Sequence, residues 1–300
     1  SDMSGFTSLQ GWWKLDASAT FDGSNWSIPD DSSNSNTGTS SGMTAANLVQ
    51  SNLNITTPYS RYALDLDGTG DRINYGVNSV FDFGTSDFAW SFWLNYESHT
   101  NYAGIFFTGS SSSTYRLKFQ TSGQILFMQN ADGDSQVADL GTNITGTGWH
   151  HIVLSRSSGT ITTFLDGSQV DTDSRAGNIN QGGGDFIVGA NGTSYLNGQL
   201  SNISIWNTAL TSAQVTELYN NKVPTNLNNH SAYSNLISWW QLGENMSFDS
   251  NVWTVLNEIT TGPNGQGFNI APAESAIVNG VGTSGNGLSS GMGGADNIVG

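Results

Sequence analysis

Cysteine is absent from this 300-residue chain, and basic side chains are scarce, with 8 Lys and Arg against 24 Asp and Glu. The absence of cysteine excludes a disulfide framework, a cysteine-ligated zinc site and a thiol nucleophile. The shortage of basic residues leaves a net charge of −16, which repels phosphate backbones, so we expect no nucleic-acid partner. No apolar run approaches the roughly 18–20 residues of a membrane span, so we expect no membrane partner either.

Charged residues make up only 11% of the chain, and Gly, Ser, Thr and Asn stand where Lys and Glu are usual. These residues favour turns and strands over helices. Residues 88–95 alternate so that Phe88, Trp90, Phe92 and Leu94 share one face of a strand. A chain of this length can bury a sizeable core unaided, so we expect an all-β protein that requires no cofactor for folding.

One short helix is predicted against this background. Thr211 and Gln214 form a capping box, and Val215 and Leu218 begin an apolar stripe. The stripe covers about ten residues, which is a packed appendage and not a second core. Pro224 ends it, and the Asn- and Ser-rich residues that follow are predicted to be a linker over 224–233.

An internal repeat is the most informative pattern. The run Trp12-Trp13-Lys14-Leu15 recurs as Trp239-Trp240-Gln241-Leu242, and the same spacing, here called the repeat offset, relates Phe21-Asp22 to Phe248-Asp249 and Trp26 to Trp253. Ser40–Met43 recurs as Ser289–Met292 at a wider spacing, which predicts an insertion within the second copy. We therefore predict a domain over 8–223, the linker, and a partial second repeat over 234–300.

The second copy is too short to form a sandwich. It has few alternating apolar residues, and ordering each residue costs about 1–2 kcal/mol of backbone entropy. Something must therefore cover Trp239, Trp240 and Trp253. We expect either the first sandwich of the same chain or a neighbouring subunit, with strand addition at an open edge as one mode.

The order of motifs between the two copies resembles laminin-G-like jelly rolls of the concanavalin A-like lectin/glucanase kind, over roughly residues 11–219. The motifs that carry the resemblance are Tyr62–Asp67 with Gly68–Asp71, Phe92-Trp93, Trp149–Val153, Leu165–Gly167 and Gly198–Trp206. The resemblance implies a concanavalin A-like antiparallel β-sandwich with one short C-terminal helix, followed by the start of a second copy. The doubled copy with its Ser-Ser-Gly-Met segments is similar to structural proteins of tailed phages.

The resemblance also raises calcium. In relatives a segment like Asp31–Gly38 helps to hold a structural calcium ion, which here would use Asp31 and Asn34. A second acidic pair lies before the last long strand of those relatives, where this chain has Ser201 and Asn202. Calcium takes 6–8 oxygen ligands, with carboxylates supplying the charge. We therefore expect chelation to change stability little, and keep a structural calcium at Asp31 and Asn34 as the alternative.

Catalytic patterns are missing. Glycoside hydrolases need two carboxylates about 5–5.5 Å apart for retention, and no Glu-x-Asp-x-x-Glu run supplies them: the only glutamates are Glu97, Glu217, Glu244, Glu258 and Glu274. His150 and His151 are adjacent on a strand and point to opposite faces, so they do not form one metal site. We expect no catalytic residues and no enzyme.

Exposed aromatic rings would suit sugars, because a flat ring offers apolar area. Trp93, on the face opposite Phe92, and Tyr96 just beyond it are the ligand-binding candidates, with packing inside the sandwich as the alternative for Trp93. We expect a non-catalytic structural or recognition module of a larger assembly: a phage virion component, located in the virion or at an extracellular surface. Its partners would be subunits of that assembly, a host-surface polysaccharide or further copies of the chain. The alternative function is a carbohydrate-binding module of a polysaccharide-degrading enzyme.

Overall fold

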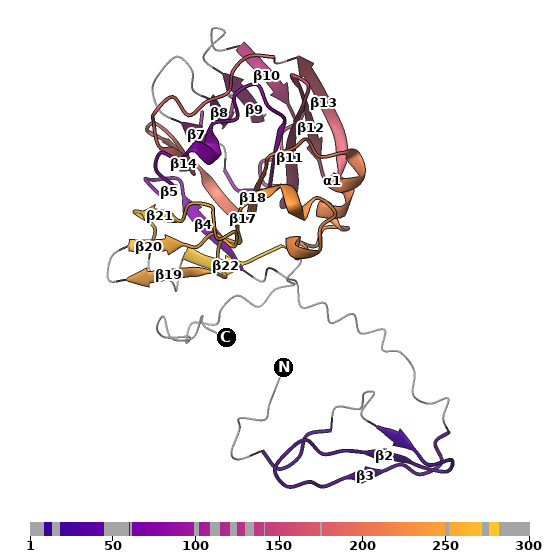
Figure 1. Cartoon of the computed structure of the whole chain (residues 1–300). Coiled ribbons are helices and arrows are strands. Elements are labelled where there is room, and N and C mark those ends of the chain that lie inside the picture. The colour runs from indigo at the N-terminus through magenta and orange to yellow at the C-terminus, as the bar shows by residue number, and fades with distance from the viewer. Residues whose placement is uncertain are drawn as a thin grey trace. The chain divides into compact units, whose positions relative to one another are not determined.

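The chain divides into two compact units, Ser1–Thr56 and Thr57–Gly300. The computed structural model describes residues 9–13, 19–44, 60, 62–98, 102–108, 115–120, 125–129, 135–140, 142–174, 176–249, 252–271 and 276–281 (Figure 1). In these ranges no helix is long and apolar enough to cross a membrane.

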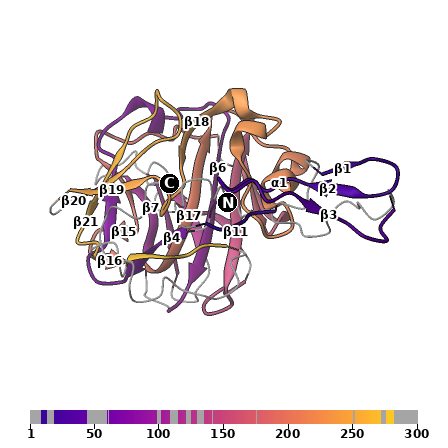
Figure 2. The same cartoon turned by 90° about the horizontal axis from the view of Figure 1, so that it is seen from below.

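The larger unit is a sandwich of two antiparallel sheets (Figures 1 and 2). The eight-stranded sheet has the order β13 (Ser168–Ser174), β12 (Thr160–Leu165), β11 (Trp149–Ser157), β6 (Phe88–Tyr96), β17 (Asn197–Trp206), β4 (Tyr62–Asp67) and β22 (Ile277–Asn279), with β18 (Leu236–Trp240) also paired to β17. The nine-stranded sheet has the order β10 (Ser135–Asp139), β9 (Ile125–Gln129), β8 (Tyr115–Phe119), β7 (Gly104–Thr108), β14 (Phe186–Val188), β5 (Arg72–Asn74), β21 (Gly265–Phe268), β20 (Val252–Val255) and β19 (Met246–Asp249). β15 (Ala190–Asn191) and β16 (Ser194–Tyr195) form a two-stranded sheet.

The predicted all-β jelly-roll class is confirmed, and the alternation in β6 shows why. Phe88, Trp90, Phe92 and Leu94 all have no exposed surface and belong to the main core between the sheets. The ring centroids of Trp90 and Phe106 lie 5.6 Å apart at 87°, an edge-to-face contact across that core. Burying aromatic side chains of this size supplies much of the hydrophobic stabilisation.

A second core lies on the outer face of the eight-stranded sheet. Helix α1 (Ser212–Tyr219) begins with the predicted capping box, in which Thr211 Oγ1 accepts from Gln214 N. Its Val215 and Leu218 are buried against the sheet, together with Val153 of β11. The helix therefore covers one end of a sheet face that would otherwise meet water.

The predicted linker over 224–233 is packed onto this second core. Leu227 lies in a short 3₁₀ turn (Leu227–Asn229) and is 5% exposed, and Ala232 is 4% exposed. His230 is buried too, and its Nε2 lies 3.1 Å from the carbonyl oxygen of Gln214. The many Asn residues favour a linker by composition, whereas two apolar anchors between them hold the segment in place. A further 3₁₀ turn (Tyr233–Asn235) leads into β18.

Residues Leu236–Ala271, here called the closing segment, complete both sheets. β18 pairs with the second half of β17, and β21 pairs with β5, at neighbouring edges of the two sheets (Figure 1). Trp239 and Trp240 have no exposed surface, and Trp253 is 2% exposed. Of the two expected covers for these tryptophans, the structure shows the sandwich of the same chain, by strand addition. β22 adds to β4 in the same way.

Residues 9–44, here called the opening unit, form a three-stranded sheet of β1 (Thr20–Phe21), β2 (Trp26–Ile28) and β3 (Gly38–Thr39). The chain is divided into its two compact units between Thr56 and Thr57, whereas the repeat placed its boundaries at 223 and 233. The difference arises because the closing segment, and not the opening copy, supplies the strands that complete the sandwich.

In the structure the repeat offset extends further along the second copy than the Ser-Ser-Gly-Met runs predict. Trp26 Nε1 donates to the carbonyl oxygen of Thr44, and Trp253 Nε1 to that of Ala271, at 2.9 Å in both cases. The repeat offset therefore holds through Ala271, the counterpart of Thr44, past the first Ser-Ser-Gly-Met run. The second such run, Ser289–Met292, lies outside the described residues.

Candidate functional site

The two aromatic residues expected to bind a ligand lie in the interior. Trp93 is 2% exposed and packs between α1 and β11, with ring centroids 4.8 Å from His151 and 6.0 Å from Tyr219. Tyr96 has no exposed surface and stacks on Phe119 at 3.6 Å. Neither ring therefore offers a face to a sugar at the surface, and Trp93 takes the packing role that was the alternative. Trp93 is buried because α1 covers the second face of β6, whereas Tyr96 lies on the inner face with Phe92 in the main core.

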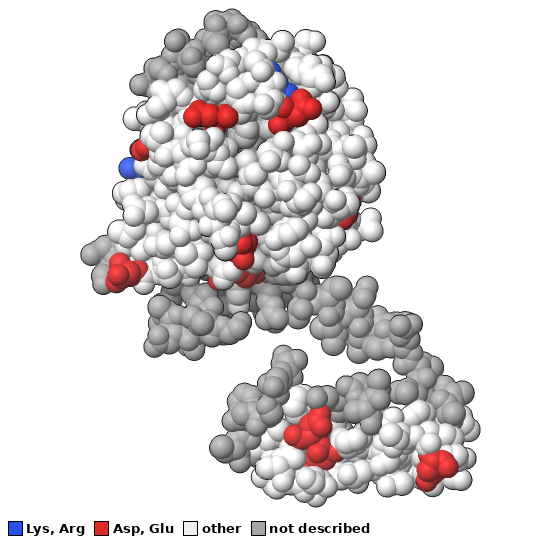
Figure 3. Space-filling model, viewed as in Figure 1, with Lys and Arg blue, Asp and Glu red and all other residues white. Residues whose placement is uncertain are grey.

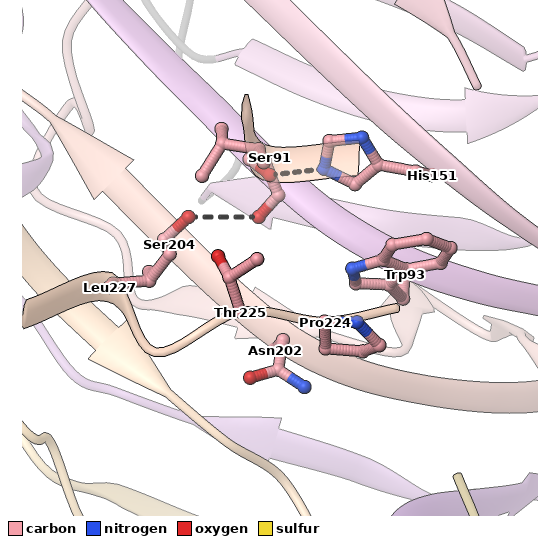
Figure 4. Close-up of a pocket in the computed structure, with 9 residues that line it drawn as sticks. Ser91, Trp93, His151, Asn202, Ser204, Pro224, Thr225 and Leu227 are labelled. Atoms are coloured by element: carbon pink, nitrogen blue, oxygen red, sulfur yellow. Dashed lines mark hydrogen bonds between the residues drawn. The ribbon is translucent and has the colours of Figure 1, made fainter. Parts of the chain in front are cut away.

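A small polar cavity lies beneath α1, lined by Ser91, Trp93, His151, Asn202, Ser204, Leu218, Pro224, Thr225 and Leu227 (Figure 4). His151 Nε2 lies 2.8 Å from Ser91 Oγ, and Ser204 Oγ donates to the carbonyl oxygen of Ser91. Burial lowers the pKa of His151 to about 3, against a small opposing effect of Asp166, so the imidazole is neutral. The free space is about that of one water molecule, which is too small for a sugar ring.

The Ser91–His151 pair lacks the third group of a catalytic triad. His151 Nδ1 has no hydrogen-bond partner among the described residues, whereas a triad places a carboxylate there. The nearby Asp166 accepts instead from the backbone N–H of His151 and lies 2.8 Å from His150 Nδ1. Ser91 is also only 3% exposed. The arrangement orients buried polar groups and does not present a nucleophile.

The predicted metal ligands lie in the opening unit. The carboxylate of Asp30, next to Asp31, organises the loop: it accepts from the backbone N–H of Trp12, Ser32 and Asn36. Burial raises the pKa of Asp30, but these hydrogen bonds outweigh it and lower the pKa to about 2.

Asn34 uses its amide as a donor, to the carbonyl oxygens of Leu9 and Gln10. Asp31 is exposed. Within the described ranges no group of three or more His, Asp or Glu side chains is placed to hold a metal ion. Calcium binding by Asp31 and Asn34 stays a prediction.

Ser201 and Asn202, which stand where relatives carry acids, meet the closing segment. Ser201 is fully buried, and its Oγ lies 3.1 Å from Ser60 Oγ. Glu244 brings a carboxylate to the same place, where it accepts from Ser60 Oγ and from the backbone N–H of Tyr62. The position is thus filled by hydrogen bonds that tie the closing segment to β17 and to the start of β4.

A row of polar side chains crosses the eight-stranded sheet just beyond the cover of α1. Asp65 of β4 pairs with Gln199 of β17, Gln199 with Asn95 of β6, and Asn95 with Trp149 of β11. Residues in register on neighbouring strands point to the same face, so these side chains lie side by side on the outer face. All are partly exposed. We call this set the sheet-end row.

Hydrogen bonds hold the sheet-end row in one arrangement. Asn95 Nδ2 donates to Gln199 Oε1 at 3.2 Å, and Gln199 Nε2 donates to Glu97 Oε1 at 3.0 Å. Burial, followed by the charge of Glu97, raises the pKa of Asp65. Sequence reasoning missed this row because its members are spread over residues 65–199 and only strand register brings them together.

One face of the molecule is mostly uncharged. In Figure 3 the acidic side chains form separate spots on a largely uncharged face, with few basic ones. Ring stacking and neutral hydrogen bonds therefore have more surface to use than ion pairs do.

Comparison with known proteins agrees with this architecture. The family model described as "Concanavalin A-like lectin/glucanases superfamily" matches residues 67–216, which is half of the chain. Both tryptophan copies lie outside that match. No curated protein matches the sequence.

Among solved structures, the chain is similar to a Bacteroides ovatus protein provisionally described as carbohydrate-binding, with a TM-score of 0.50, 14% identity and coverage of 88% of this chain and 69% of that one. It is also similar to domain 4 of a Geobacillus stearothermophilus arabinanase in complex with arabinotriose, with a TM-score of 0.43, 20% identity and coverage of 52% and 76%. At 14% identity, the likeness to the Bacteroides ovatus protein speaks for the fold alone. By the family match and the two-sheet architecture together, the chain belongs to the concanavalin A-like lectin/glucanase superfamily.

Proposed function

We propose that the chain is a non-catalytic binding module that binds a glycan at the sheet-end row. The observation that carries the proposal is the half-buried Trp149 beside the amides of Asn95 and Gln199 and the carboxylate of Asp65. Sugar rings combine hydroxyl groups, which pair with amides and carboxylates, with apolar C–H faces, which stack on an indole. The fixed hydrogen bonds of the row keep the ordering cost of binding low.

The net charge narrows the ligand. A protein with a net charge of −16 repels sulfated or otherwise anionic polysaccharides, so the proposed ligand is a neutral or amino sugar. That charge also makes binding to an anionic glycan the result that would count against this ligand class.

Substituting the indole tests the site. Trp149→Ala in the full chain should weaken glycan binding about tenfold or more, because a buried aromatic anchor carries a large share of binding energy. Tyr233→Ala is the matched control, since Tyr233 is an aromatic residue that is 42% exposed and lies outside the row. Glycan-array screening followed by calorimetry with the best sugar measures both variants. Equal binding by Trp149→Ala and the wild type would place the ligand elsewhere.

Catalysis needs its own test, because Asp65 and Glu97 bring two carboxylates to the same end of the sheet. A raised pKa on one of two neighbouring carboxyl groups is the pattern of a glycosidase acid. Against that role, Glu97 is engaged by the amide of Gln199. We expect no release of reducing ends from laminarin, agarose, carrageenan or lichenan. Turnover that is lost in Asp65→Asn or Glu97→Gln would make the chain an enzyme.

We further propose that this binding serves the surface of a tailed-phage virion, where the module would contact neighbouring subunits or a host glycan. The support is the doubled tryptophan copy and its likeness to phage structural proteins. The second candidate, a carbohydrate-binding module of a polysaccharide-degrading enzyme, shares the same fold and site. The genomic neighbourhood separates the two, because capsid and tail genes favour the first and hydrolase genes the second.

A further inference from the structure

The opening unit reproduces the hydrogen bonds of the closing segment at the repeat offset. Trp12 N donates to Asp30 Oδ1 at 2.7 Å, and Trp239 N donates to Asn257 Oδ1 at 3.0 Å. The same correspondence relates the bonds from Trp13 Nε1 to the Asn36 carbonyl and from Trp240 Nε1 to the Pro263 carbonyl, at 2.8 and 3.0 Å. The two segments therefore share one local structure although the sequence repeats only part of it.

Strand register agrees as well. Phe21 pairs with Trp26, and Phe248 pairs with Trp253, with ring centroids 5.2 Å apart in both hairpins. In the third strands, Ile28 pairs with Gly38 just as Val255 pairs with Gly265. The hairpin and its third strand thus form in the same register in both segments.

Burial separates the two copies. Trp240 has no exposed surface and packs on Tyr75 at 4.3 Å between ring centroids, whereas Trp13 is 44% exposed. Ile270 is 7% exposed, whereas its counterpart Met43 is 44% exposed. Five positions that the closing segment buries keep their apolar or glycine character in the opening unit, whereas the buried Gly243 and Gly267 correspond to Asp16 and Ser40. The five pairs are Leu236 and Leu9, Trp239 and Trp12, Trp253 and Trp26, Val255 and Ile28, and Gly265 and Gly38.

The glycine pair is the most telling. A Cβ on Gly265 would lie 2.6 Å from both Ile73 Cγ2 and Tyr75 Cε1, so the sandwich requires glycine there. A Cβ on Gly38 would meet nothing closer than 3.7 Å in the opening unit, and no positive φ requires glycine at this position. The glycine at residue 38 is thus suited to a contact with a sandwich that its own unit does not contain.

We propose that the opening unit is a second closing segment, which docks between β17 and β5 of a second copy of this chain in the register that Leu236–Ala271 uses. β18 and β21 show how such a segment binds: one strand extends each sheet, Trp240 packs in the main core between the sheets, and Trp239 packs in the second core on the outer face. Chains linked in this way join head to tail, because the donor lies before the acceptor in each copy.

The covalent link within a chain decides which segment occupies the groove, by which we mean the site between β17 and β5. A segment in the same chain has an effective concentration on the order of millimolar. At about 100 µM protein, the resident closing segment is therefore favoured about tenfold over an equal segment from a second copy. A substitution that weakens the resident by more than about tenfold removes this advantage over the opening unit of another chain, and an opening unit that instead binds within its own chain would leave the protein monomeric.

Gly265→Ala provides that substitution in the full chain. Overpacking costs about 1–3 kcal/mol, which is about 5- to 150-fold in the equilibrium. We expect this variant to form dimers or longer oligomers at the same protein concentration by light scattering. Gly38→Ala/Gly265→Ala should stay monomeric, because the second alanine leaves the opening unit intact and blocks its docking. Oligomers of equal amount in both variants would overturn the proposal.

A second acceptor variant guards against a Gly265→Ala chain that tolerates the extra methyl group. Trp240→Ala should oligomerise in the same way, and Trp13→Ala/Trp240→Ala should not. If Gly265→Ala and Trp240→Ala are both folded and monomeric at this concentration, the proposal is wrong.

Engineered cysteines report the register, since the chain has none of its own. Gln266 pairs with Asn74, and the counterpart of Gln266 in the opening unit is Thr39. Directly paired residues have Cα atoms about 4.5–5.5 Å apart, within the range that a disulfide spans. A Thr39→Cys chain mixed with an Asn74→Cys chain, both carrying Gly265→Ala, should form the mixed disulfide.

A Thr39→Cys chain mixed with a Ser168→Cys chain, in the same Gly265→Ala background, measures chance collisions. Docking in the proposed register requires the 39–74 link to exceed this control about tenfold. A link no more frequent than the control would overturn the proposed register. A single chain that carries both Thr39→Cys and Asn74→Cys tests the partner. If the 39–74 link forms only within such chains and not between chains, a second copy is not the partner.

Discussion

The opening unit and the closing segment have the same hydrogen bonds and the same strand register, yet only one of them is buried. Trp12 and Trp239 each donate from their backbone N–H to a side chain 18 residues further on. Trp13 remains 44% exposed while Trp240 is fully enclosed. Short-range polar contacts therefore specify the shape of this segment, and packing on the sandwich adds stability to a shape that is already present.

The largest contrast should appear when the second tryptophan of each pair is removed. Trp240→Ala should lower the free energy of unfolding of the sandwich by about 3–5 kcal/mol, because it leaves a cavity beside Tyr75. Trp13→Ala should change the same transition by less than about 0.5 kcal/mol, as for other substitutions away from a core. Urea denaturation of both full-length variants measures the difference. Equal destabilisation would mean that the opening unit also supports the sandwich.

The next largest difference between the sandwich and the opening unit should appear in how their stability depends on pH. The pKa of His151 is about 3 in the folded sandwich and 6.5 in its ordinary state. Between these two pH values the imidazole is therefore protonated in the unfolded chain and neutral in the folded chain. Stability is fully present above pH 6.5 and falls towards pH 3, by at most about 1.4 kcal/mol per pH unit. Thermal melts from about pH 7 to pH 4 test this. His151→Gln should remove that slope, and an unchanged slope in the variant would assign it to other groups.

The opening unit should respond at lower pH. The pKa of Asp30 is about 2 there, below its ordinary 3.8, so its contribution is present above 3.8 and is lost as pH falls towards 2. In the sandwich, the pKa values of Asp65 and Asp71 are raised, primarily by burial, and act in the opposite sense to His151. These carboxyl groups are common to the wild type and to His151→Gln, so the difference between the two isolates the histidine.

A smaller effect should follow from removing the side chains that accept the backbone N–H of Trp239 and of Trp12. Asn257→Ala removes the acceptor of the Trp239 and Ile259 backbone N–H groups and should cost about 1–3 kcal/mol. Asp30→Ala removes the corresponding acceptor in the opening unit and should leave the sandwich transition unchanged. Amide hydrogen exchange at Trp12 and Trp239 measures each loss separately. Faster exchange at both sites in either single variant would show that the copies are coupled.

The smallest expected effect is that of chelation. Calcium at a concentration of about 100 times the dissociation constant of a site would add about 2.7 kcal/mol to stability. Ser201 is instead engaged with Ser60, and Glu244 accepts hydrogen bonds at the same place. We expect the melting temperature to be unchanged by EDTA. A drop that calcium restores would establish ion binding and direct attention to Asp31 in the opening unit.

Sequence reasoning reached the features that depend on near neighbours. The alternation of residues 88–95 gave the inner face of β6, and Thr211 with Gln214 gave the start of α1. It failed where a second layer decides: alternation alone treats Trp93 as facing outward, but α1 covers that face and buries the ring. The sheet-end row required strand register between segments far apart in the chain, which no local pattern carries.

The pairing of β4 with β22 has a mechanical consequence. Tyr62, where the first strand of the sandwich begins, lies opposite Asn279, where β22 ends. Tension applied between these two residues pulls an antiparallel pair apart from one end, so its hydrogen bonds break one after another and not all at once. Such an unzipping geometry yields at low force, and it frees the strand that follows the closing segment first. A chain stretched along its length would therefore begin to open between β4 and β22, while β6, β11 and β17 still hold the rest of the sheet together.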